Sequence, residues 1–229
     1  GINTFTGGIT INAGTLQIGT GGTLSPGNVT NNSALIFNNS ISNAVTDAIS
    51  GSGALTISSG TVALNATNTY TGATFVNGGT LLVNNAIGTG PVTVASGARL
   101  GGNGTIRGSA TVNSGGILMP GNSLGTLTIG SNLTMNAGSV MNFDLGASSD
   151  RVVVSNNLSL TCTLNVTNSG GLASGTFTLF TYGGNLLAST ITLGSVPSGK
   201  LYQIDTSTPG QVNLIVGTSA FKSPACPGA

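Results

Sequence analysis

The chain contains no histidine, and its only carboxylates are those of four aspartates, Asp47, Asp144, Asp150 and Asp205. Without histidine the commonest general base, the Ser-His-Asp and Cys-His nucleophile systems and most transition-metal sites are removed. Five basic residues and a formal net charge of +1 give no basic stripe for the phosphates of a nucleic acid. We therefore expect no catalytic residue, no metal, no cofactor and no nucleic-acid partner.

Charge of either sign is scarce, since charged residues make up 4% of the 229 residues. No apolar run approaches the roughly 18 residues of a membrane-spanning helix, so we expect no membrane span. A hydrophobic fraction of 38% and a mean hydropathy of +0.35 argue against disorder. Because Gly1 falls directly before a repeat, we expect a processed or truncated chain.

Short alternations of apolar and polar residues fill the sequence, as in "GTLQIG" and "NFDLG". This period of two is typical of β-strands with one face turned inward. Pieces rich in Gly and Asn, such as "NAG" and "NGG", separate the strands and tolerate the left-handed backbone of tight corners. The pattern predicts an all-β fold with closely spaced corners.

One stretch occurs almost twice, as "NTFTGGITINAGTLQIG" at residues 3–19 and "NTYTGATFVNGGTLLVN" at residues 68–84. We expect each copy to form a strand, a corner and a second strand of one solenoid rung. The side chains predicted to face inward are Ile9, Ile11, Leu16 and Ile18 in the first copy and Val76, Leu81 and Val83 in the second. Strand repeats without helices favour a β-solenoid, in which stacked Asn and Thr ladders replace charges that would repel.

The texture changes near residue 138, where strands lengthen and aromatic residues become more frequent. We divide the chain into solenoid repeats at 1–137, a more irregular closing unit at 138–217 and a tail at 218–229. In the closing unit, Phe177, Leu179, Phe180 and Tyr182 place apolar groups on both faces of one strand, which predicts a strand covered on both sides. The last predicted strand is "QVNLIV".

Several segments together resemble the autotransporter-associated β-strand repeat proteins of bacteria. They are "NTYTGATFVNGGTLLVN", "GARLGGNGTI", "GGILMPGNSLGTLTI", "FDLGASSDRVVVSNNLSL" and "YQIDTSTPGQVNLIV". The resemblance implies a right-handed parallel β-solenoid, or β-helix, that is exported and then displayed on or released from the bacterial cell.

A few polar side chains are candidates for chemistry or binding. Asp144 and Asp150 flank the turn "LGASS". They are either a catalytic carboxylate pair or a turn-stabilising pair, and for Asp150 a further alternative is an ion pair with Arg151. The structural roles are favoured. Arg99 and Arg107 are expected outward, as solvated surface or as contacts for an anionic glycan. The sequence also contains the glycosylation-type tripeptides at Asn28, Asn132 and Asn165, which composition alone explains.

The two cysteines lie in different settings. Cys162 shares its parity with Leu160 and Leu164, so we expect it in the core as a buried thiol. Cys226 lies in the tail, and an oxidising environment would permit a disulfide between Cys162 and Cys226 or a bond from the tail to another subunit.

Uniform rungs and little chemistry favour a structural role outside the cell. We expect a subunit of a self-assembling surface fibre or matrix, built by head-to-tail association through the unpaired solenoid ends. The alternative is an adhesin or glycan-binding passenger segment that holds a surface glycan along one flat side, and a polysaccharide-cleaving β-helix enzyme ranks third.

Overall fold

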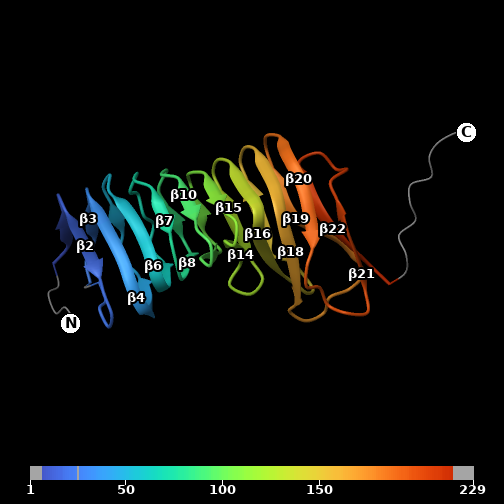
Figure 1. The fold of residues 1–229 in the computed structure, drawn as a ribbon, viewed down its shortest axis with the longest axis horizontal. Helices are drawn as coiled ribbons and strands as arrows, with labels where there is room; N and C mark the ends of the chain where they lie inside the picture. Colours follow the sequence, from blue (N-terminus) through green and yellow to red (C-terminus); the bar gives the residue numbers. More distant parts are fainter. Residues whose placement is uncertain (1–6, 25, 219–229) are drawn as a thin grey trace, which may run out of the picture.

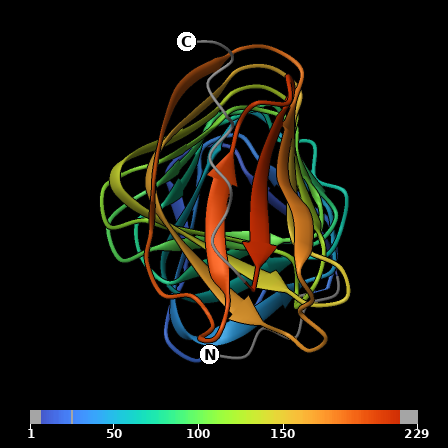
Figure 2. The ribbon, with the colours of Figure 1, turned by 90° about the vertical axis from the view of Figure 1, so that its right-hand side faces the viewer.

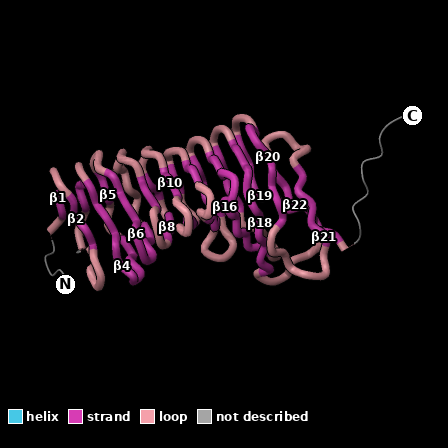
Figure 3. Tube along the Cα trace, viewed as in Figure 1, coloured by secondary structure: helices cyan, strands magenta, loops and turns pink. Residues whose placement is uncertain are grey.

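A computed structural model describes residues 7–24 and 26–218, which form twenty-two strands and no helix (Figures 1 and 3). The strands wind into an elongated column of about 8 turns. Nearly all pairings between neighbouring turns are parallel. The predicted all-β parallel β-solenoid is therefore confirmed.

Each turn has three faces, and successive turns lie over one another around one core (Figure 2). On the first face lie β2 (Thr15–Ile18), β4 (Ala34–Val45), β6 (Ala54–Leu64), β7 (Thr74–Val76), β10 (Val92–Val94), β13 (Ala110–Val112), β16 (Leu133–Leu145), β18 (Leu158–Asn168) and β20 (Leu186–Leu193). The long strands β4, β6, β16, β18 and β20 continue onto the second face, which also holds β8 (Thr80–Val83), β11 (Arg99–Gly102) and β14 (Ile117–Pro120). The third face holds β1 (Ile9–Ile11), β3 (Val29–Asn31), β5 (Ile49–Ser50), β9 (Ala86–Ile87), β12 (Thr105–Ile106), β15 (Thr126–Ile129), β17 (Arg151–Val154), β19 (Gly175–Tyr182), β21 (Leu201–Asp205) and β22 (Gln211–Gly217).

Inward side chains form columns because parallel register places equivalent residues directly over one another. One column on the second face is entirely buried and runs through Val62, Leu81, Leu100, Leu118, Met141 and Leu164. Each such side chain contributes about 1.5–3 kcal/mol of burial free energy. The predicted inward residues Val76, Leu81 and Val83 are fully buried, whereas Ile9 and Leu16 at the first turn are half-buried.

The corner between the first and second faces is a column of glycines. Gly60, Gly79, Gly97, Gly115 and Gly138 all have φ values between 67° and 81°. This left-handed region is readily available only to glycine. At Gly79, moreover, a Cβ atom would overlap the carbonyl oxygen of Gly60 in the turn below. Glycine is thus required at Gly79 both by its backbone conformation and by the close approach of the neighbouring turn.

Asparagine side chains link successive turns, as the sequence predicted. Asn84 Nδ2 donates to Asn65 Oδ1 of the preceding turn at 2.8 Å, and Asn122 Nδ2 donates to Asn84 Oδ1, two turns away, at 2.9 Å. A second ladder pairs Asn165 Nδ2 with Asn142 Oδ1 at 3.0 Å. Neutral amide side chains on neighbouring turns can form hydrogen bonds with one another, whereas side chains of equal charge at the same positions would repel each other.

The two sequence copies do form strand, corner and strand, but they lie on different faces. In the second copy β7 is on the first face and β8 on the second. In the first copy β1 is on the third face, and β2 stacks below β4, β6 and β7 on the first face. The first copy is therefore offset by one face, because the stretch of chain between equivalent positions of the two copies does not make a whole number of turns.

The turns lengthen toward the C-terminal end. The stretch of chain from Val92 to its partner Ala110 is shorter than the stretch from Leu158 to its partner Leu186. β22 then pairs antiparallel with β19 and with β21, which closes the third face irregularly. The division at residue 138 stays a prediction, and that residue lies within β16.

Strand β19 accommodates its apolar residues through a β-bulge. Its register with β22 shifts between Thr178 and Phe180, and the consecutive residues Leu179 and Phe180 are both fully buried. Phe177 and Tyr182 are half-buried and pack against the core. A bulge can direct two neighbouring side chains inward. The burial of both Leu179 and Phe180 is therefore explained in part by the bulge, and not only by burial of both faces of the strand.

Candidate interaction surfaces

Asp150 stabilises the junction of two loops in neighbouring turns. Its Oδ2 accepts a hydrogen bond from the amide of Asp144 at 2.8 Å, and its Oδ1 accepts one from the amide of Gly125 at 2.9 Å. The amide of Asp150 in turn donates to the carbonyl of Asp144 at 2.9 Å. The carboxylate thus takes its hydrogen bonds from backbone amides rather than from Arg151, which is exposed. This geometry supports the turn-stabilising alternative.

Burial dominates the electrostatics of Asp150. The residue is 1% exposed, and desolvation raises the pKa of its carboxyl from 3.8 to about 6. The two amide donors lower the pKa, and the nearby Asp144 carboxylate raises it. A group held in this way by the backbone is poorly placed to reach a substrate.

A shallow depression of about 400 Å³ lies in front of this pair. Leu82, Met119 and Pro120 form its apolar side, and Asn142, Asp144 and Thr167 contribute polar side chains. Its size is at the lower end of small-molecule sites, and it lacks the aromatic lining that is common in them. Among residues 7–24 and 26–218, no three His, Cys, Asp or Glu side chains gather as metal ligands would.

The arginines are outward, as the sequence predicted. Arg99 and Arg107 are exposed beside the fully buried Leu100 and Ile106. Arg107 Nη1 donates to the carbonyl oxygens of Asn68 at 3.1 Å and Ile87 at 3.3 Å. Arg107 is therefore tied to the two turns below it. A glycan contact through either arginine stays a prediction.

The glycosylation-type asparagines have roles between turns. The Oδ1 atoms of Asn28, Asn132 and Asn165 accept hydrogen bonds from the amides of Ala48, Asn157 and Ser195. These distances are 3.1, 3.0 and 2.8 Å respectively. Their side chains thus satisfy backbone donors at the corners of the solenoid.

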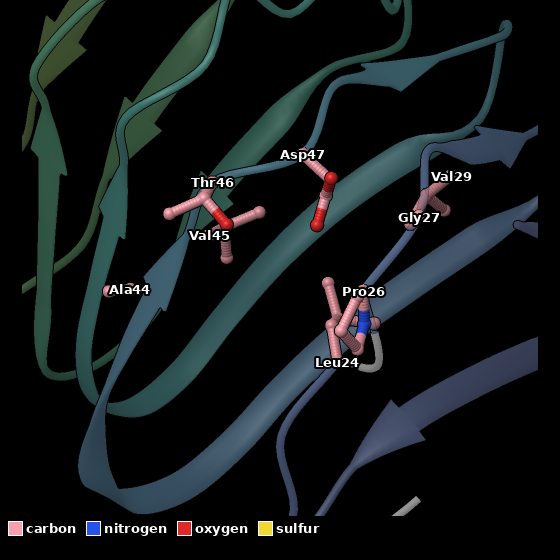
Figure 4. Close-up of a pocket in the computed structure, with 8 residues that line it drawn as sticks. All are labelled: Leu24, Pro26, Gly27, Val29, Ala44, Val45, Thr46 and Asp47. Atoms are coloured by element: carbon pink, nitrogen blue, oxygen red, sulfur yellow. The ribbon is translucent and has the colours of Figure 1, made fainter. Parts of the chain in front are cut away.

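A smaller depression of about 110 Å³ lies near the N-terminal turns (Figure 4). Asp47 and Val45 approach it from the end of β4, while Leu24 and Pro26 approach it from the connection between β2 and β3. The volume is well below the range of about 300–1,000 Å³ that is usual for ligand sites. We assign no ligand to it.

Cys162 lies in the core, in register with Leu160 and Leu164, and is 6% exposed. Burial raises the pKa of its thiol to about 12. Cys226 lies outside the described residues. The disulfide alternatives therefore stay predictions.

We expect Cys162 to resist alkylation in the folded protein, because the reactive thiolate is both scarce and inaccessible. Native protein treated with iodoacetamide should carry no label at Cys162 over a period that fully labels the unfolded, reduced chain. Peptide mass spectrometry gives the result, with Cys162→Ser as the control. Rapid native labelling would contradict the core position.

The side chain of Phe75 faces outward, which the sequence patterns named above did not predict. Phe75 is the central residue of β7 and is 39% exposed on the first face. Its neighbours Thr74 and Val76 face inward and are buried. The signal was present in the parity of "ATFVNGG", because a period of two that places Val76 inward places Phe75 outward.

Comparison with known proteins supports the resemblance. Residues 1–18 and 50–83 match the passenger-associated-transport-repeat family. Over 116 residues the chain is 42% identical to the adhesin BmaC autotransporter of Brucella suis biovar 1 (strain 1330). The matched region covers 46% of this chain and 3% of that protein. The described part of the chain has no helix long and apolar enough to span a bilayer.

Proposed function

We propose that this chain, which carries autotransporter-associated passenger repeats, is a non-enzymatic adhesive passenger segment exposed on the surface of a bacterium. The observation that carries the proposal is the agreement between the repeat match within residues 50–83, the similarity to an autotransporter adhesin, and a regular solenoid in which those residues form the stacked strands of two neighbouring turns. The chain spans a small part of that adhesin's length, so binding by this segment is a proposal about the segment itself.

The comparisons favour the adhesin alternative over the fibre subunit that the sequence analysis placed first. A protein similar to an adhesin is expected to bind surfaces, whereas nothing in the similarity bears on self-assembly. Head-to-tail association stays a prediction. Within the described residues, the third face ends in the antiparallel strands β22 and β21, whereas the first and second faces end in β20, which pairs in parallel with β18.

The proposal predicts saturable attachment to cells. Beads coated with the purified chain should bind an epithelial cell layer more than albumin-coated beads do, and the soluble folded chain should compete with them. Chain that has been heat-unfolded before coating is the matched control. Attachment no greater than that of albumin beads, or attachment that survives unfolding, would count against the proposal.

A further inference from the structure

We propose that the outer surface of the first face binds a neutral, linear, hydroxyl-rich polysaccharide along the solenoid axis, an inference that rests on the adhesive function and names its ligand class. The surface is defined by the central outward residues of the strands from β6 to β18, and the same register continues beyond them through Ile36 of β4 and Ala188 of β20. These residues, here called the first-face row, are Thr56, Phe75, Thr93, Thr111, Thr134 and Ser159.

Strand register makes this row straight. Each member pairs directly with the next, from Thr56 with Phe75 to Thr134 with Ser159. Neighbouring strands lie about 4.8 Å apart, so the five steps from Thr56 to Ser159 span about 24 Å. A sugar ring in an extended β-linked chain has a repeat close to this strand separation. One ring can therefore face each turn over several turns.

The chemistry of the row suits carbohydrate. Five members carry a hydroxyl group that can both donate and accept hydrogen bonds. Phe75 adds an exposed ring, whose face can pack on the C–H groups of a sugar. The edge of the face adds amides, with Asn136 Nδ2 bonded to Asn113 Oδ1 at 3.0 Å.

Charge narrows the ligand class. No member of the row is ionisable, and Arg99 lies on the second face beyond the glycine corner. An uncharged surface offers no Coulomb attraction to an anionic glycan or a polycation. The row would thus bind its ligand through neutral hydroxyl groups and through the one apolar ring of Phe75.

Phe75 also contrasts with the other aromatic residues. The rings of Phe37, Phe143 and Phe180 are fully buried, as is that of Tyr70 at 1% exposure. Phe177, Tyr182 and Tyr202 are half-buried against the core. Phe75 alone among the described aromatic residues is exposed, and it interrupts a row whose other positions are hydroxylic.

The test measures binding of β-1,4-linked hexasaccharides of glucose and of N-acetylglucosamine by isothermal titration calorimetry. We expect Phe75→Ala to raise the Kd about tenfold, and Thr93→Val with Thr111→Val to raise it by a similar factor. Ile41→Ala, at an exposed apolar residue outside the row, should leave the Kd unchanged. Thermal unfolding of each variant should match the wild type, which separates a binding effect from loss of fold.

Three results would overturn the inference, and two of them concern the neutral hexasaccharides. One is wild-type affinity in Phe75→Ala, and the other is no binding of either hexasaccharide by the wild type. Tighter binding of a heparin hexasaccharide than of the neutral ones would also overturn it. If cell attachment persists while no neutral hexasaccharide binds, the ligand assignment fails and the adhesive function stands; if attachment is also absent, both fail.

Discussion

The folded chain should be more stable at pH 4 than at pH 7, by about 2–3 kcal/mol. The cause is Asp150, whose carboxyl has a pKa of about 6 in the folded state and an ordinary value of 3.8. Between these values the folded state binds more protons than the unfolded state, so stability falls as pH rises through this window. A shift of one pKa unit is worth about 1.4 kcal/mol, which gives the stated difference.

Few groups other than Asp150 can contribute to this profile, because the chain has four aspartates, no histidine and no glutamate. Asp144 is the group whose charge acts on the pKa of Asp150, and Arg151 is exposed. Urea unfolding at pH 4, 5, 6 and 7 measures the profile. Asp150→Asn should flatten it, whereas Asp144→Asn should keep most of the slope. Stability that rises from pH 4 to pH 7 would show that the two amide donors outweigh burial.

Replacing Gly79 by alanine should destabilise the protein by at least about 3 kcal/mol. The residue has a φ of 67°, and an added Cβ would also overlap the carbonyl oxygen of Gly60. That oxygen belongs to the backbone of the turn below, so it cannot move without disturbing the corner column. The midpoint of thermal unfolding should fall accordingly.

Two further glycines separate the causes. Gly97 has a φ of 77° but open space around an added Cβ, so Gly97→Ala should cost only the left-handed strain of about 1–2 kcal/mol. Gly19 has neither constraint, and Gly19→Ala should be nearly neutral. Equal losses at Gly79 and Gly97 would mean that the stacked corners relax and that overlap contributes nothing.

Local alternation predicted the fold because in a solenoid it coincides with burial. The parity of Val76, Leu81 and Val83, and that of Cys162, placed these side chains in the core correctly. The same alternation places Phe75 outward, although hydrophobicity alone would place a phenylalanine inside. The turn-stabilising role of Asp150 was also among the alternatives that the sequence supplied.

The other features of the structure depend on which residues of neighbouring turns contact one another. The local sequence pattern does not specify these contacts. Asn68 is fully buried, and its Oδ1 accepts from the amide of Ile49 at 2.9 Å while its Nδ2 donates to the carbonyl of Ala66 at 2.8 Å. Composition marks such an asparagine as a surface or corner residue. Likewise, the bulge at Leu179 arises only from pairing with β22.

The offset between the two sequence copies affects how such a gene could change in length. Recombination between residues 3–19 and 68–84 would delete one copy together with the segment that separates them. The copies lie on different faces, so such a deletion would rotate everything downstream by about one face relative to whatever precedes it. The row members from Thr93 to Ser159 lie downstream of the second copy and would keep their register, whereas Thr56 lies in the deleted segment and Phe75 lies within the recombining copy. Shortening of this kind would therefore turn the four hydroxyl-bearing positions from Thr93 to Ser159 to another side of the solenoid and shorten the row at its N-terminal end.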